Sequence, residues 1–173
     1  MKKINIIGKH NQEKLNKVVN PKREVIISSS IDFSGIAMDY RSQIGYANKI
    51  FLDQSFNIKP FIEREITNKI YGYKRQDIEK NLLNNEKLIT YDSTLEKIVE
   101  SKLKCFYCKC EMALLYENVR QKNQWTLDRI DNDIGHNYDN VVIACLECNV
   151  RRKRLNSERF EFSKKCMHIK KVL

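Results

Sequence analysis

The chain has 173 residues and a formal net charge of +10 at pH 7, with 32 Lys and Arg against 22 Asp and Glu. A hydrophobic fraction of 42% is enough for a packed core. The basic excess favours polyanionic partners, nucleic acid first and anionic membrane second. No apolar run approaches the roughly 20 residues of a spanning helix, and the start lacks a secretory signal. We therefore expect an intracellular protein, cytoplasmic or nuclear, without a membrane partner.

The first hundred residues predict a mainly helical region. Residues 25–35 begin as a short strand that Ser and Gly end. Residues 38–56 carry apolar side chains at spacings that suit one face of a helix. Pro60 suits the first turn of a second helix, because that amide needs no partner there, and Gly72 is expected to end it.

Two further helical stretches are expected before residue 100. Residues 73–83 are basic and amphipathic, which is typical of a solvated helix face; contact with a nucleic-acid backbone is the alternative. A capping residue at 92–94 would begin another helix with Leu95 and Ile98 on its buried side. No repeat or Pro/Gly-rich linker marks the boundary near residue 100.

Two CxxC pairs carry the strongest motif in the chain. They are Cys105 with Cys108 and Cys145 with Cys148. Paired thiols of this spacing in a reducing compartment predict one zinc ion with four sulfur ligands, and therefore a structural ion. A redox dithiol or buried structural thiols are the alternatives. Cys110 is either a competing ligand or a spare thiol, and Cys166 is expected to be free.

The 36 residues between the pairs are more than a plain zinc ribbon holds, which is roughly 15–20. Trp125, Leu127 and Ile130 predict a short strand. Residues 131–137 supply turn chemistry, and the β-branched run 140–144 predicts a second strand. The second cysteine pair then opens onto a helix. Two strands and a helix, joined by a metal ion, are the expected unit.

In this order of motifs, residues 101–155 resemble the HNH endonuclease family, in its four-cysteine zinc-stapled type similar to phage junction-resolving endonucleases. The family pattern is CxxC, an Asp-His pair on the first strand, an Asn before the second strand, and CxxC followed by Asn or His. Here Asp128 with Arg129, Asn140 and Asn149 fall at these positions. The resemblance implies an α+β fold: a helical region over 1–100, and a zinc-stapled ββα-metal (treble-clef-like) module over 101–173.

The resemblance also implies a function. It implies hydrolysis of nucleic-acid phosphodiester bonds, in DNA before RNA, with Mg²⁺ or Mn²⁺ held by Asp128 and Asn149. A hard cation takes carboxylate and amide oxygens and keeps positions open for phosphate, so the residue types fit. The alternatives are an Asp128–Arg129 ion pair and a helix-capping Asn149. The N-terminal hundred residues are more loosely similar to extensions of proteins in large DNA viruses, so a viral protein is one possibility.

Arg129 departs from the family, which has a histidine there to accept a proton from water. Arginine cannot accept that proton, but it can bind phosphate through two donors. Two nearby residues could compensate: His136 as the base, or Asp131 by orienting water. A histidine that only bonds a loop carbonyl is the alternative for His136. Asn140 is expected to brace the loop as scaffold.

The end of the chain is strongly basic, with nine Lys and Arg against three Glu from Cys145 onward. Four of these cations follow Asn149 directly and are expected to contact nucleic-acid phosphates. They are Arg151, Arg152, Lys153 and Arg154. Arg152 is the preferred contact, because it shares a helix side with Asn149. A localisation signal or a solvated face would give the same run.

Two functions remain open from the sequence. One is an HNH-type endonuclease. The other is a catalytically inactive, zinc-stabilised module that binds nucleic acid, which the arginine in the base position favours. DNA versus RNA, target specificity, oligomeric state and the role of residues 1–100 are left open.

Overall fold

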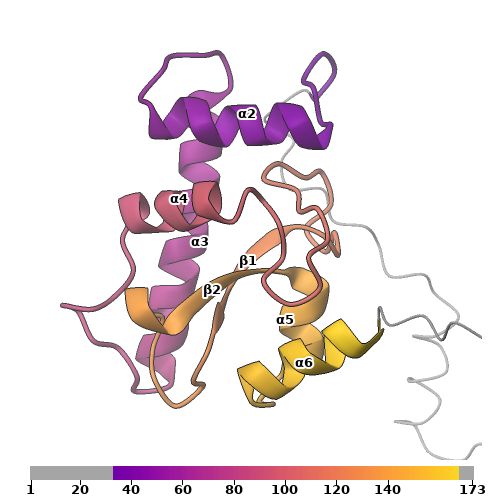
Figure 1. Ribbon diagram of the computed structural model, residues 1–173. Helices are drawn as coiled ribbons and strands as arrows, with labels where there is room; N and C mark the ends of the chain where they lie inside the picture. The colour runs from indigo at the N-terminus through magenta and orange to yellow at the C-terminus, as the bar shows by residue number, and fades with distance from the viewer. Residues whose placement is uncertain (1–32, 168–173) are drawn as a thin grey trace, which may run out of the picture.

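The structure is a computed structural model and describes residues 33–167 (Figure 1). Its elements run in chain order as follows: α2 (Tyr40–Phe51), α3 (Lys59–Glu79), α4 (Tyr91–Glu100), β1 (Trp125–Arg129), the 3-10 helix η1 (Tyr138–Asn140), β2 (Val141–Cys145), α5 (Leu146–Arg152) and α6 (Ser157–Met167). Helices with a two-stranded sheet confirm the mixed α+β class. The strand predicted from residue 25 begins outside the described residues.

Helix α2 forms where the apolar spacing predicted it. Asp39 caps its start, because its Oδ1 accepts a hydrogen bond from the amide of Ser42 at 3.1 Å. Ala47 and Ile50 are buried on the predicted face. The helix is shorter than the predicted stretch 38–56, and residue 53 already has a positive φ of 52°.

Helix α3 begins at Lys59, with Pro60 in its first turn as predicted. The predicted end at Gly72 is wrong, because the helix continues to Glu79. A glycine in a helix interior costs only about 1 kcal/mol relative to alanine. Buried side chains on both sides of it, Ile66 and Asp77, hold the helix against the rest of the protein. The basic stretch 73–83 is thus largely the second half of α3.

Helix α4 also starts earlier than predicted. Its cap is Thr90 rather than a residue at 92–94. Thr90 Oγ1 accepts from the amide of Ser93 at 3.2 Å, and Ser93 Oγ accepts from the amide of Thr90 at 2.9 Å. This reciprocal capping box satisfies two amides that the first helical turn would leave without partners. Leu95 and Ile98 are buried, as predicted.

The sheet consists of β1 and β2, which pair antiparallel with Trp125 opposite Cys145 and Arg129 opposite Val141. Both strands agree with their predicted positions to within about one residue. Helix α5 follows β2 without a linker, and the thiol of Cys145 caps it by accepting from the amide of Cys148 at 3.4 Å. The second cysteine pair therefore lies at the junction of strand and helix, as the motif predicted.

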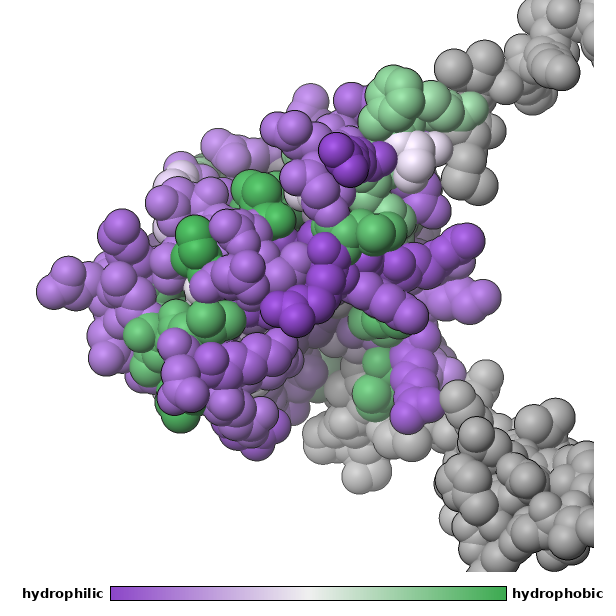
Figure 2. Space-filling model, turned by 90° about the horizontal axis from the view of Figure 1, so that it is seen from below, coloured by the Kyte–Doolittle hydropathy of each residue, from purple (hydrophilic) through white to green (hydrophobic). Residues whose placement is uncertain are grey.

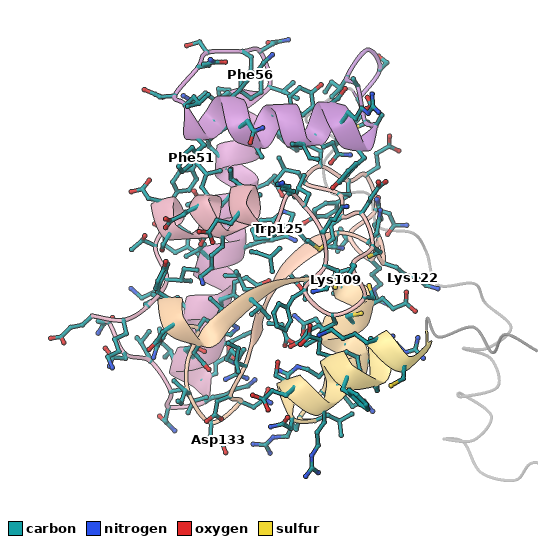
Figure 3. The ribbon with its side chains drawn as sticks, in the orientation of Figure 1. Phe51, Phe56, Lys109, Lys122, Trp125 and Asp133 are labelled. Atoms are coloured by element: carbon teal, nitrogen blue, oxygen red, sulfur yellow. The ribbon has the colours of Figure 1, made fainter. Side chains whose placement is uncertain are left out.

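Both parts of the chain contribute to one hydrophobic core. Ile62 and Ile66 of α3 and Ile98 of α4 belong to the same buried cluster as Trp125 and Leu127 of β1. Figure 1 shows α3 running behind the two strands along most of the molecule, and Figure 3 shows Trp125 between the helices and the sheet. The helical region thus packs directly against the cysteine-bearing part.

The surface is mostly hydrophilic in the view from below, with apolar patches that are separated from one another (Figure 2). None of the helices among the described residues is long and apolar enough to cross a membrane.

Two glycine substitutions are expected to change stability in opposite directions. A Cβ at Gly72 meets nothing within 4 Å, so Gly72→Ala should raise the free energy of unfolding by about 0.4–1 kcal/mol. A Cβ at Gly135 would lie 2.5 Å from the carbonyl oxygen of Leu82 and 2.9 Å from Oδ2 of Asp77. Gly135→Ala should therefore lower the free energy of unfolding by about 1–3 kcal/mol. Urea unfolding of both variants measures this, and equal effects would contradict the close approach of the loop to α3.

Candidate functional site

The four cysteines of the CxxC pairs meet in one cluster. The sulfur atoms of Cys105, Cys108, Cys145 and Cys148 all lie within 4.8 Å of one another. The sulfurs of Cys108 and Cys145 are 3.8 Å apart. Four sulfurs around a tetrahedral ion with bonds of about 2.3 Å would be separated by about 3.8 Å. The cluster could therefore hold one metal ion, as the motif predicted.

Backbone hydrogen bonds deliver the two pairs to the same point. The amide of Cys145 donates to the sulfur of Cys105 at 3.3 Å, and the amide of Phe106 donates to the carbonyl of Ile143 at 2.9 Å. The first pair is therefore attached to the last residues of β2. Lys109, with a positive φ of 56°, turns the chain back after Cys108.

Without a cation, the thiols of the cluster do not all ionise equally. The neighbouring thiol of Cys110 and those of Cys145 and Cys148 hydrogen-bond to Cys105 and hold its pKa well below its usual range. The pKa of Cys148 is raised, first by its hydrogen bond with Cys105. One thiolate thus suppresses the ionisation of its neighbour. A bound cation removes this conflict, because metal ligation requires every thiol to be deprotonated.

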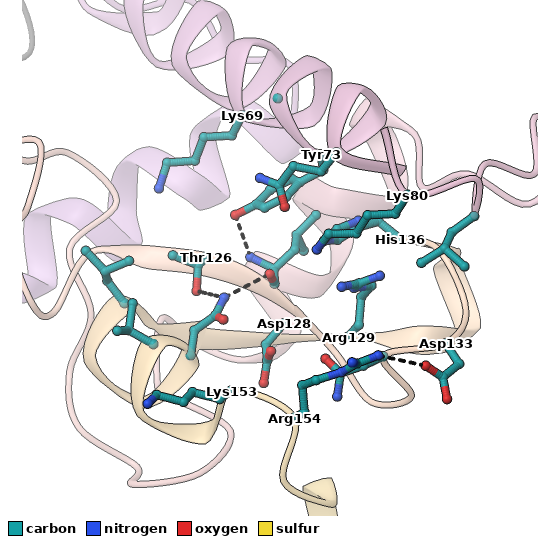
Figure 4. A pocket seen from close by; sticks show the side chains of 18 of the residues that line it. Lys69, Tyr73, Lys80, Thr126, Asp128, Arg129, Asp133, His136, Lys153 and Arg154 are labelled. Carbon is teal, nitrogen blue, oxygen red and sulfur yellow. Dashed lines mark hydrogen bonds and ion pairs between the residues drawn. The ribbon is translucent and has the colours of Figure 1, made fainter. Parts of the chain in front are cut away.

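A cleft of about 1020 Å³ lies between α3 on one side and β1 with α5 on the other (Figure 4). All four residues that were predicted to be catalytic line it. They are Asp128, Arg129, His136 and Asn149. The structure therefore brings together residues from β1, from the loop before β2 and from α5.

The cleft has a cationic lining. Five lining residues are basic: Lys69, Lys80, Arg129, Lys153 and Arg154. Two are acidic, and both are already paired. Asp133 lies 3.2 Å from Arg154 in an exposed ion pair, and Asp128 is paired with the buried Arg152. The unpaired charge facing the cleft is therefore positive, which suits an anionic ligand.

Asp128 is 5% exposed and forms a buried ion pair with Arg152. Nε of Arg152 donates to Oδ2 at 2.6 Å, and Nη2 donates to Oδ1 at 2.9 Å. The hydroxyl of Tyr107 also donates to Oδ2, at 2.7 Å. The alternative of an Asp128–Arg129 ion pair is wrong, because the guanidinium that binds this carboxylate belongs to Arg152 of α5.

The prediction that Arg152 contacts phosphate disagrees with the structure. Its side chain is fully buried, at 0% exposure. Besides Asp128, it donates to the backbone carbonyls of Arg129 and of Leu155. The guanidinium is therefore bonded to groups inside the protein. Arg152 joins β1 to α5 and does not face a ligand.

The other cations of the run are exposed. Lys153 and Arg154 line the cleft. Arg151 lies on the helix surface, where Nη1 reaches Glu147 at 3.3 Å. Contact of these three residues with nucleic acid stays a prediction.

Asn149, in α5, is half-buried and faces the same cleft as Asp128. Its side-chain nitrogen donates to Oγ1 of Thr126 at 3.0 Å and to the carbonyl of Leu127 at 3.1 Å. Both acceptors belong to β1, so the amide is fixed across the junction of strand and helix. This use of the nitrogen leaves the amide oxygen available to a ligand. The cap of α5 is Cys145, so Asn149 is not the helix cap.

His136 is buried, with 3% of its surface exposed, and is held by α3. Its Nδ1 lies 2.7 Å from Oδ1 of Asp77, and its backbone amide donates to Oδ2 of the same carboxylate at 2.6 Å. Burial lowers the pKa of His136 below the ordinary value of 6.5, and the charges of Arg129 and Lys80 act in the same direction, while Asp77 opposes them. The alternative in which His136 bonds a loop carbonyl is therefore wrong for Nδ1.

Asn140 braces the loop between the strands, which confirms its expected scaffold role. Its amide nitrogen donates to the carbonyls of Asp131 at 2.9 Å and Gly135 at 3.0 Å, and its oxygen accepts from the amide of Asp131 at 2.9 Å. Asp131 itself is exposed and accepts from the amide of Asp133 at 2.9 Å, as in an Asx turn. A water-orienting role for Asp131 stays a prediction.

The sequence analysis missed the wall of the cleft that α3 provides. Lys69 and Tyr73 of α3 and the C-cap residue Lys80 line it, and Asp77 supports it from behind. Lys69 lies 4.4 Å from the ring of Trp125 and donates to Gln124 at 3.1 Å, and burial lowers its pKa to about 7. The only signal in the sequence was the basic, amphipathic character of residues 73–83, which does not say what the helix packs against.

Comparison with known proteins finds sequence similarity to one segment of a viral protein whose activity is not stated. No protein-family model matches the chain, and no solved structure matches it. The chain is 38% identical over 94 residues to "Uncharacterized protein R423" of Acanthamoeba polyphaga mimivirus. The match covers 54% of this chain and 15% of the viral protein. It therefore relates this chain to a short segment of a much longer protein, and agrees with the possibility of a viral source.

The cysteine cluster predicts one tightly bound metal ion per chain. Elemental analysis should find one equivalent in the purified protein and much less in Cys148→Ser, because the remaining three sulfurs leave the tetrahedron incomplete. Removing the ion with a chelator should also lower the unfolding temperature. Cys166→Ser, at an exposed thiol in α6, is the matched control and should keep both values. Equal metal content in the two variants would contradict the assignment.

The buried ion pair predicts a large difference between neighbouring arginines. Arg152→Ala leaves Asp128 buried without its partner, so the free energy of unfolding should fall by about 3–5 kcal/mol. Arg151→Ala removes an exposed helix pair with Glu147 and should cost less than about 0.5 kcal/mol. Urea unfolding distinguishes the two. Similar losses would show that Arg152 does not hold β1 to α5.

Proposed function

We propose that this chain is a metal-dependent endonuclease of the HNH type, which hydrolyses phosphodiester bonds in nucleic acid. DNA is the expected substrate, and RNA is the alternative. One observation carries the proposal: Asp128, Arg129, His136 and Asn149 line a single cleft whose unpaired charge is positive. A polyanion is attracted to such a surface, and the same cleft offers oxygen ligands, a buried imidazole and a guanidinium.

The arrangement of β1, β2 and α5 supports membership of the ββα-metal class. The two strands and the helix are consecutive, and the second CxxC lies at the strand–helix junction. Zinc is the ion that suits the cysteine cluster, since four thiolates in a tetrahedron match its preferred ligands. Four sulfur ligands leave no open position, so this zinc is structural and keeps the junction in shape.

A second ion, Mg²⁺ or Mn²⁺, would be held by Asp128 and Asn149. The donor types fit a hard cation: the amide oxygen of Asn149 is free, and a carboxylate offers about four lone pairs. Donors from Arg152 and Tyr107 use three of those on Asp128. When bound, such an ion neutralises charge on the phosphate and the leaving oxygen.

The residues of the chain then have distinct roles. A water molecule attacks phosphorus, forming one P–O bond, while the bond to the sugar oxygen on the opposite side breaks. His136 accepts the proton that water loses, and the leaving oxygen takes a proton from solvent. Arg129 holds a non-bridging phosphate oxygen, and Lys153 and Arg154 contact neighbouring phosphates.

The alternative is a catalytically inactive module that binds nucleic acid and is stabilised by zinc. Arg129 favours it, because this arginine occupies the position at which the family carries its base. Such a module would bind DNA in a salt-dependent manner and would not cleave it. A nicking assay with Mg²⁺ and Mn²⁺ therefore separates the two functions.

The amide of Asn149 provides the cleanest test of the nuclease. Asn149→Ala should lower the rate of plasmid nicking by about 10²-fold or more, because a ligand near the developing charge is lost. Asp128→Asn should lower the rate as well, but it also removes the charge that pairs with the buried Arg152, so the loss of the ion ligand is read most directly from Asn149→Ala. Asn48→Ala, at an exposed position of α2, is the matched control. Nicking by Asn149→Ala at the rate of the control would refute the proposal.

A further inference from the structure

The carboxylate of Asp77 is buried at 1% exposure in the second half of α3, a region outside the resemblance that the sequence carries. Both of its oxygens point at His136, 59 residues further along the chain. One accepts from the backbone amide and the other lies against Nδ1 of the ring. A carboxylate without solvent contact and with one ring as its side-chain partner needs an explanation.

The imidazole is fixed on every side but one. The ring of Tyr73 packs against it in a tilted arrangement, with centroids 4.6 Å apart and an interplanar angle of 31°. The carbonyl of His136 accepts from the amide of Ile89 at 2.9 Å, so the backbone is anchored as well. Gly135 allows this approach, because a Cβ there would meet the carboxylate of Asp77.

The remaining ring nitrogen, Nε2, is the open side. Among the described residues, Nε2 has no hydrogen-bond partner. The buried side-chain atoms there that lack both a partner and solvent contact are the hydroxyl of Tyr91 and Oδ1 of Asn137, so Nε2 keeps some contact with solvent. His136 lines the cleft, and Figure 4 shows it beside Lys80 at the α3 wall, across from Asp128 and Arg129. Nε2 is therefore the atom that a ligand in the cleft can reach.

A carboxylate only accepts hydrogen bonds, so the hydrogen of the neutral ring belongs on Nδ1, and Nε2 keeps its lone pair. We infer that Asp77 is a positioning residue that holds His136 in the tautomer in which Nε2 can accept a proton in the cleft. The inference rests on the proposed nuclease and deepens it: the helical region supplies the residue that turns a loop histidine into the base.

The charges around His136 agree with this role. From α3 it faces Asp77 and Tyr73, from the C-cap of that helix it faces Lys80, and from β1 it faces Arg129. Burial and the two cations keep the ring neutral near pH 7, and Asp77 limits how far its pKa falls. A base must be neutral before the reaction and still basic enough to accept a proton.

Asp77→Asn tests the inference with little change of shape. An amide oxygen can still accept from the backbone of residue 136, but the amide nitrogen would donate to Nδ1 and drive the ring hydrogen to Nε2. The nicking rate at saturating DNA should fall about 10²–10⁴-fold, with KM within about twofold of wild type. The acid limb of the pH–rate profile should also move to lower pH. Glu79→Gln, an exposed carboxylate on the same helix, is the control.

NMR of the imidazole nitrogens provides a readout that does not need activity. Long-range proton–nitrogen spectra of the full chain should show His136 with its hydrogen on Nδ1 in the wild type and on Nε2 in Asp77→Asn; His136→Gln assigns the signals. If Asp77→Asn does not fold, the wild-type spectrum decides, because the inference requires the ring hydrogen of His136 to be on Nδ1.

The outcomes separate this inference from the nuclease itself. An active wild type with an equally active Asp77→Asn would overturn the inference and leave the proposed nuclease standing. An equally active His136→Gln would overturn both the inference and the assignment of His136 as the base. A wild-type hydrogen on Nε2 would overturn the inference as well. A wild type that binds DNA but does not nick it with either ion would overturn the nuclease and the inference together.

Discussion

A two-stranded sheet with five residues per strand has only marginal stability by itself. In this protein, four thiols that come together at one point hold the end of the sheet in place. Two of the thiols come from a loop before the sheet, and two lie where β2 passes into α5. Their approach therefore defines the angle between the last strand and the helix. Everything that faces the cleft from β1 and α5 depends on that angle.

Helix α5 shows how the constraint is transmitted. Cys148 and Arg152 are four residues apart, so they lie on the same side of the helix. The first belongs to the sulfur cluster, and the second reaches across to Asp128 of β1. Asn149, next to Cys148, bonds to β1 beside them. One short helix is thus attached to one strand by a cluster, a buried ion pair and an amide, and this leaves little freedom for the site residues it carries.

The features that the sequence predicted correctly are local ones. The CxxC pairs, both strands, the turn between them and Asn140 as its brace each follow from residues close together in the chain. Errors arose where tertiary contacts decide. Gly72 does not end α3, because packing on both sides of it outweighs its low helix propensity. Arg152 was expected to face phosphate, since helical spacing gives the side of a helix but does not say what lies across from it.

The pairing of Asp77 with His136 was beyond the sequence for the same reason. The two residues are separated by 59 positions, and neither belongs to a spaced motif. An aspartate in a basic, amphipathic stretch is expected on the surface. Its burial only makes sense once the loop is known to pack against α3, with a glycine at the point of closest approach.

The same contact affects how Arg129 would act in the proposed nuclease, where it stands at the position at which HNH endonucleases have a histidine. Arg129 cannot take up a proton, but its position in β1 puts a permanent charge near His136. Burial is the main cause of the lowered pKa of that histidine, and the charge of Arg129 adds to it. In the proposed reaction the arginine therefore has two effects: it attracts phosphate, and it keeps the neighbouring imidazole neutral. In that proposal the strand carries an arginine that cannot act as the base, and the charge of this arginine favours a neutral imidazole in the loop, which α3 holds in place.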